Sequence, residues 1–217
     1  MAFEGPAITD YRNVSTLNRA YLSLLQVDRH TRKSLFRLAP PLLRRITSLT
    51  SQQVDRLSAT PFLLLSFRER DDKLWSQILS DERGSDLFTS SVANDLDRLR
   101  AAGLGFVWQL ARQNPYTLRL ICGASLYWCE QIAERTVFGL LTAAAPHTDL
   151  LELRRANDTE LWRKLLDQGI CRETDIRAAA HISALQTLLT RPVDNASRPW
   201  SVAACSTRAG TLRVADE

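Results

Sequence analysis

The chain has 217 residues, of which 45% are hydrophobic and 24% are charged, and this composition excludes an intrinsically disordered or collagen-like protein. No apolar run approaches the roughly 18 residues of a membrane-spanning helix, and the N-terminus lacks a basic signal sequence, so we expect a cytoplasmic protein without membrane contact. The net charge of +4 is uneven: residues 1–70 hold 11 Arg and Lys against 5 Asp and Glu, whereas residues 71–100 hold 4 against 7.

The first predicted element is an amphipathic helix at residues 14–27. Leu17 and Tyr21 recur there at the spacing of one helical face. Either Asn13 or Ser15 would cap this helix, because both side chains accept hydrogen bonds from free backbone N–H groups.

Three short helices are predicted next. A basic helix at residues 31–38 is expected to stop at Pro40-Pro41, because proline cannot continue a helix. A second helix, both apolar and basic, follows the prolines. Thr50, with Gln53 three residues later, is typical of a capping box and predicts a third helix through Leu57.

The middle of the chain contains an ambiguous apolar run and a polar stretch. The run at residues 61–67 is either a strand or a helical turn, and periodicity does not distinguish the two. The turn-rich residues 80–95 predict a boundary. A helix at 96–113 follows, and Asn114-Pro115 is expected to open a long helix that reaches residue 145.

Two further helices are predicted at residues 158–169 and 173–189. They meet at a short turn containing Gly169, which is also the layout of a helix-turn-helix. Glu173 and Asp175 stand at the start of the second helix, where they would repel DNA. A helical hairpin within the core is therefore favoured over a recognition motif.

Together these elements predict an all-α protein with two helical parts. Residues 1–79 would form the first helical domain, 80–95 a polar linker, 96–190 a second helical bundle of unknown role, and 191–217 a disordered tail. No tandem repeat is evident.

The residues that usually carry catalysis form no recognisable set. The three histidines are far apart in sequence, and the four cysteines form no CxxC pair. Cys122 and Cys129 are seven residues apart, which on one helix places both on the same face as buried thiols. We therefore expect no catalytic residue, no metal, no cofactor and no enzymatic activity.

The basic segment is the candidate for binding. Arg32, Lys33 and Arg37 share a helical face, and Arg44 and Arg45 extend it. Such a face can neutralise DNA phosphates and give salt-dependent binding. A solvated surface, or a surface that faces an acidic partner, explains the same pattern.

Residues 17–68 resemble the FlhD subunit of a bacterial flagellar regulator. The matching positions, in order, are Asn18, Tyr21-Leu22, Leu24, Gln26, Phe36-Arg37-Leu38, Leu49-Thr50, Gln53, Leu57, Thr60 and Phe67-Arg68. The resemblance implies an all-helical dimer that joins an FlhC partner, binds promoter DNA and recruits RNA polymerase. Leu65 stands where FlhD carries its intersubunit disulfide cysteine, so a covalent dimer is not expected.

Two functional hypotheses follow. In the first, the chain is a dimeric FlhD-like transcriptional regulator that contacts DNA directly or through an FlhC-like partner. Its N-terminal helices would then be a dimerisation region, with interface candidates Tyr21, Leu22, Leu24, Phe36 and Leu38. In the second, the chain is a helical protein-protein interaction module that makes no contact with DNA.

Overall fold

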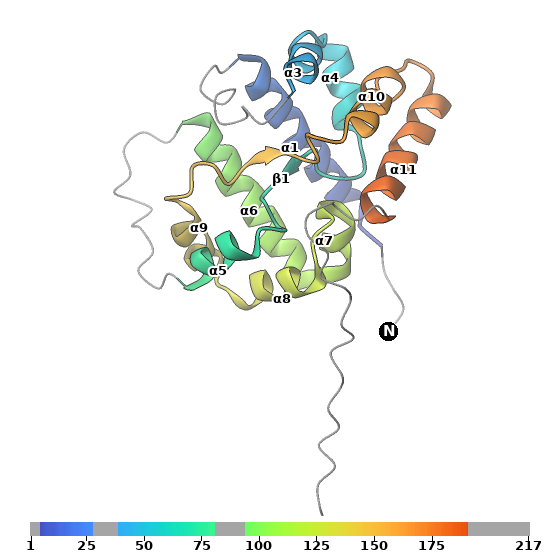
Figure 1. The fold of residues 1–217 in the computed structure, drawn as a ribbon. Helices are drawn as coiled ribbons and strands as arrows, with labels where there is room; N and C mark the ends of the chain where they lie inside the picture. The colour runs from blue at the N-terminus through green and yellow to red at the C-terminus, as the bar shows by residue number, and fades with distance from the viewer. Residues whose placement is uncertain (1–4, 28–38, 81–93, 191–217) are drawn as a thin grey trace, which may run out of the picture.

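The structure is a computed structural model that describes residues 5–27, 39–80 and 94–190 (Figure 1). Within these ranges the chain forms ten helices and one two-stranded sheet, which confirms the all-α prediction. None of the helices in these ranges is long and apolar enough to cross a membrane.

The elements fall on either side of the gap at residues 81–93. Before the gap lie α1 (Ile8–Val27), α3 (Pro40–Thr47), α4 (Ser51–Ser58), β1 (Leu65–Ser66) and α5 (Asp72–Ser80). After the gap lie α6 (Asp95–Gln113), α7 (Pro115–Cys122), α8 (Leu126–Glu134), α9 (Val137–Ala144), β2 (Glu152–Leu153), α10 (Thr159–Asp167) and α11 (Thr174–Thr190).

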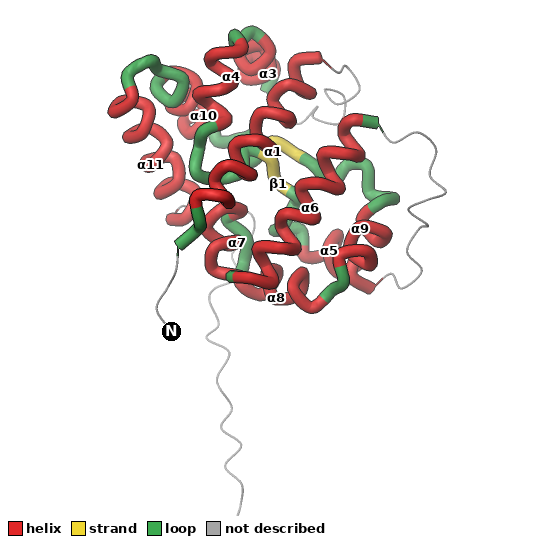
Figure 2. Tube along the Cα trace, turned by 180° about the vertical axis from the view of Figure 1, so that it is seen from behind, coloured by secondary structure: helices red, strands yellow, loops and turns green. Residues whose placement is uncertain are grey.

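The centre of the molecule is formed by α1, α6 and the strand pair. Helix α1 packs against α3, α4 and α6, and α6 in turn packs against α7, α8 and α9. Strands β1 and β2 pair antiparallel beside the two central helices (Figure 2). A single hydrophobic cluster runs from Val14 to Leu188, so residues on both sides of the gap share one core.

Several predicted helix ends are confirmed by their caps. The Thr50 side chain accepts from the Gln53 N–H and the Gln53 side chain accepts from the Thr50 N–H, which completes the capping box of α4. The Asn114 side chain caps α7, with Pro115 in the first turn. Local side-chain chemistry was sufficient to place these boundaries.

Other predicted ends were wrong. Helix α1 begins at Ile8 rather than at residue 14. Pro40-Pro41 opens α3, because the first-turn N–H that proline lacks would have no helical partner. The helix predicted at residues 31–38 lies outside the described residues. The long helix expected from 115 to 145 is three helices, separated by the left-handed Gly123 and by the Ser125 and Thr136 caps. Cys122 and Cys129 are both buried, but on different helices.

A buried asparagine fixes the apolar run that precedes β1. The Asn18 amide donates to the Phe62 carbonyl at 2.9 Å and to Thr60 Oγ1 at 3.1 Å. Its oxygen accepts from the Leu64 N–H at 2.7 Å. Asn18 and Thr60 are both among the FlhD-like positions. These hydrogen bonds explain why an asparagine and a threonine occupy them.

Candidate nucleic-acid and partner interface

The basic face predicted from the sequence is described only at α3. Leu42 and Leu43 of this helix pack against the core, and Ile46 is fully buried. This inward face leaves Arg44 and Arg45 exposed on the outer side, in the last turn. Positive charge at a helix C-terminus is stabilised by the helix dipole.

The two arginines differ in their partners. Arg45 Nη2 lies 2.5 Å from Asp167 Oδ1 of α10, and both side chains are nearly half exposed. Arg44 forms no ion pair with any residue in the described ranges. Arg44 is therefore the cation of α3 that can meet an anion directly, whereas Arg45 must share or release Asp167.

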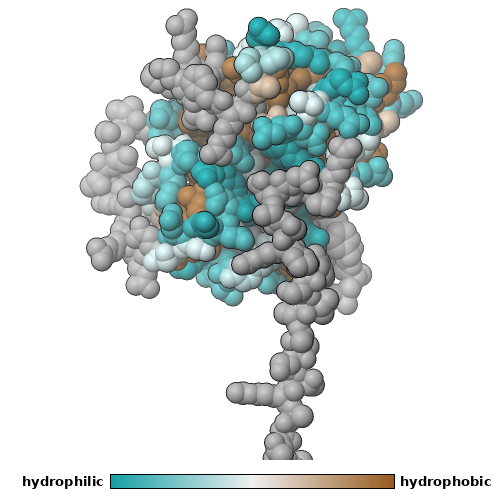
Figure 3. Space-filling model, in the orientation of Figure 1, coloured by the Kyte–Doolittle hydropathy of each residue, from teal (hydrophilic) through white to brown (hydrophobic). Residues whose placement is uncertain are grey.

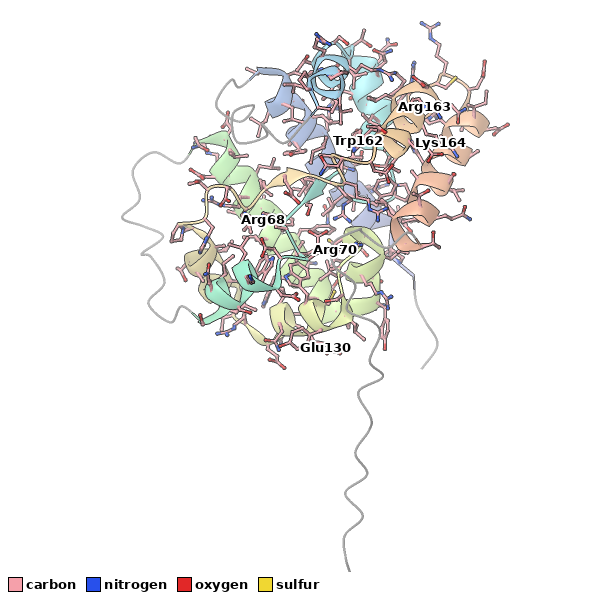
Figure 4. All side chains as sticks on the ribbon, viewed as in Figure 1. Arg68, Arg70, Glu130, Trp162, Arg163 and Lys164 are labelled. Atoms are coloured by element: carbon pink, nitrogen blue, oxygen red, sulfur yellow. The ribbon has the colours of Figure 1, made fainter. Side chains whose placement is uncertain are left out.

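The second half of the chain adds a cation that the sequence analysis missed. Arg163 of α10 is exposed and reaches Asp167 at 4.0 Å, so one carboxylate serves two guanidinium groups. Figure 4 places Arg163 and Lys164 on α10, at the end of the molecule that also carries α3. Arg163 and Arg45 are 118 positions apart, and no local pattern connects them. Figure 3 shows hydrophobic residues gathered around α3, on a face that is otherwise mostly hydrophilic.

The remaining predicted DNA contacts, Arg32, Lys33 and Arg37, lie outside the described residues, as do the interface candidates Phe36 and Leu38. Tyr21 and Leu22 are fully buried within this single chain. Leu24 is partly buried against the same core. Of the interface candidates that are described, only Leu24 therefore keeps exposed surface.

The groups most able to support catalysis are held in unreactive states. Burial raises the pKa of the Cys129 thiol to about 12 and raises that of Cys122 further, which disfavours the thiolate. His181 is buried, with Nε2 3.0 Å from the Gly169 carbonyl, and burial lowers its pKa. In the ranges that the structure covers, no cluster of His, Cys, Asp and Glu is suited to a metal.

Comparison with protein families gives one match. Residues 8–105 match the family described as flagellar transcriptional activator (FlhD). The curated proteins and the solved structures give no match. The matched range runs from the start of α1 into α6 and contains the whole 17–68 resemblance.

The match bears on function in general terms. It supports a general role as a flagellar transcriptional activator, and the matching family consists of regulators and not of enzymes. That agrees with the expected absence of enzymatic activity. Residues 8–105 thus form a region similar to FlhD, which confirms the resemblance predicted from the N-terminal helices.

Proposed function

We propose that the chain is an FlhD-like transcriptional regulator that binds duplex DNA through its N-terminal basic face, directly or together with an FlhC-like partner. The family match over residues 8–105 is the observation that carries the proposal. The exposed Arg44, with Arg45 and Arg163 beside it, supplies cations at one end of the molecule. Arginine suits this role because its planar group donates two parallel hydrogen bonds to phosphate.

The predicted contacts set the expected salt dependence. Each phosphate that a cation neutralises adds about 0.9 to the slope of log affinity against log salt concentration. Five contacts, through Arg32, Lys33, Arg37, Arg44 and Arg45, therefore give a slope of about −4 to −5. Arg44→Ala/Arg45→Ala should reduce the steepness of this slope by about 2.

The test is fluorescence anisotropy of a labelled random duplex, titrated with the full chain across a salt series. The matched control is Arg98→Ala/Arg119→Ala, which removes two exposed cations from α6 and α7. Binding that both double variants weaken equally would reduce the proposal to a general charge effect. Absence of binding at low salt, with or without a partner subunit, would refute it.

The alternative is an interaction module that makes no DNA contact. It is favoured by the Arg45–Asp167 pair, which already neutralises part of the basic face. It is also favoured by the exposed apolar side chains Ile176, Ile182 and Leu189 of α11. This alternative would be established if the chain binds no DNA at any salt concentration but binds a protein partner.

A further inference from the structure

The order of elements repeats after the gap. When 86 is added to their residue numbers, α3 and α4 become 126–133 and 137–144, and the observed α8 and α9 are Leu126–Glu134 and Val137–Ala144. Helix α1 becomes 94–113, against Asp95–Gln113 for α6. After one extra residue in the loop that follows α9, an offset of 87 places β1 on β2 and α5 on α10 with no discrepancy. By the same numbering, α7 corresponds to residues 29–36, which lie outside the described ranges.

The buried positions repeat as well. Val14, Leu17, Asn18, Tyr21 and Leu25 of α1 correspond to Arg100, Gly103, Leu104, Val107 and Ala111 of α6, and all ten residues are buried. Ile46 of α3 corresponds to the buried Ile132 of α8. Thr50 caps α4 as Thr136 caps α9. The two halves therefore share a packing pattern as well as an element order.

The clearest repeat is a turn that leads into a helix in each half. The sequence Arg-x-x-Asp-x-x-Leu-Trp occurs at 68–75 and again at 155–162. Arg68 and Arg155 are the two non-glycine residues with positive φ in the described ranges, at 52° and 46°. Each pairs with the aspartate three positions later, and that aspartate accepts from the N–H of the leucine.

The tryptophans complete the motif. Trp75 Nε1 donates to the carbonyl eight residues earlier at 3.1 Å, and Trp162 Nε1 does the same at 3.0 Å. Both rings are buried. Two segments 87 positions apart thus adopt one rare backbone conformation and make one set of hydrogen bonds.

The two halves pair reciprocally. In the strand pair, Leu65 faces Leu153 and Ser66 faces Glu152. The offset of 87 turns each of these pairs into the other, which is the signature of a two-fold axis between β1 and β2. Figure 1 agrees, because α3 and α4 lie at one end of the molecule and α8 at the other, with the strands between them.

The helices beyond the strands are exchanged between the halves. Helix α5 packs against α9, and Trp75 meets Trp128 of α8 edge to face, with ring centroids 5.1 Å apart. In return, α10 packs against α3, where Asp167 holds Arg45. A buried ion pair, Arg154 to Glu69 at 3.1 Å, also joins the halves.

We infer that residues 8–80 (the first unit) and 95–167 (the second unit) are two diverged copies of one FlhD-like unit that pair within a single chain. The surface through which two copies of the unit would meet is thus filled by the chain itself. The inference does not depend on DNA binding. It corrects the expectation that the sequence contains no repeat.

Divergence has left the two units with different charges. Arg44 and Arg45 of α3 correspond to Glu130 and Gln131 of α8. Figure 4 shows Glu130 at the opposite end of the molecule from Arg163. A single chain therefore carries this arginine pair at one end only, whereas a symmetric pair of first units would carry it at both ends.

The test is a disulfide placed across the axis. Residues that face each other in an antiparallel pair have Cα atoms about 4.5–5.5 Å apart, within the range that a disulfide spans. We would introduce Leu65→Cys/Leu153→Cys into the full chain with Cys171→Ser/Cys205→Ser, and oxidise the protein at micromolar concentration. The control pair is Leu65→Cys/Leu188→Cys, which joins β1 to α11.

The expected product is a cross-linked monomer that migrates faster on a non-reducing gel, with no such band from the control pair. A disulfide-linked dimer, or free thiols in a folded protein, would overturn the inference. If the variants fail to fold, light scattering of the unmodified chain decides. A mass near 24.5 kDa supports the inference, whereas twice that mass, as the predicted homodimer requires, overturns it.

Discussion

Replacement of Asn18 by leucine tests the packing of the first unit. Asn18 is fully buried, and its side chain bonds to the backbone of Ser58, Phe62 and Leu64. Leucine keeps the branched shape of the asparagine side chain but is larger, so Asn18→Leu removes the hydrogen bonds and adds some crowding. The Phe62 carbonyl keeps the Thr60 hydroxyl as a donor. The buried Leu64 N–H and Ser58 carbonyl then lose their hydrogen bonds to the Asn18 amide.

The expected cost follows from those two groups. Each unsatisfied buried polar group costs about 1–3 kcal/mol, so Asn18→Leu should lower the free energy of unfolding by about 2–6 kcal/mol. With a urea dependence of about 2–3 kcal/mol per molar, the unfolding midpoint should fall by about 1–3 M. Far-UV circular dichroism measures this midpoint directly.

The control is Asn13→Leu, an exposed change on the same helix, which should alter stability by about 0.5 kcal/mol or less. The reasoning is refuted if Asn18→Leu and Asn13→Leu have equal midpoints. Such a result would mean that the Asn18 contacts do not hold the segment before β1.

Three further predictions concern buried groups. Arg154→Met should cost about 3–5 kcal/mol in urea unfolding, because it leaves the Glu69 carboxylate buried without its cation; a loss under 1 kcal/mol would contradict a buried pair. Burial lowers the pKa of His181, so the unfolded chain binds the extra proton and stability should fall as the pH drops below about 6.5. A His181→Gln variant should lose that part of the decline between pH 7.5 and 5.5, and an unchanged decline would count against it. Trp75→Phe and Trp162→Phe should have similar costs of about 1–3 kcal/mol, since each removes the same hydrogen bond, whereas one neutral substitution would speak against equivalent units.

The sequence predicted the features that depend on local chemistry. The Thr50 capping box and the Asn114-Pro115 helix start are set by residues within one turn, and the structure confirms both. The same kind of signal was present at Gly123 and Thr136, where a long helix was predicted instead. Apolar periodicity continues across those breaks, so it favoured one long helix although cap residues were present.

The repeat escaped the sequence analysis because the two units share few identical residues in their helices. In α1 and α6 the burial pattern is kept although Asn18 has become Leu104. Identity is concentrated in the Arg-x-x-Asp-x-x-Leu-Trp motif. Both copies of that motif can be found in the sequence, but only the structure shows that they adopt the same backbone conformation.

The candidate site was predictable only in part. Exposure of Arg44 and Arg45 follows from helical periodicity around the buried Ile46. The pairing of Arg45 with Asp167 joins residues 122 positions apart and comes from the exchange of helices between units. Tertiary contacts of this length leave no trace in local patterns.

The most direct test of DNA contact through α3 is a salt titration of DNA binding in which the charges of the two units are exchanged. Arg44→Glu/Arg45→Gln gives the first unit the residues of the second, and Glu130→Arg/Gln131→Arg does the reverse. We predict that the first exchange reduces the steepness of the salt slope by about 2, and that the second, which adds cations at the opposite end of the molecule, leaves the slope unchanged. A slope that the first exchange leaves unchanged, or that the second exchange steepens by about 2, would contradict contact with DNA through the α3 end of the chain.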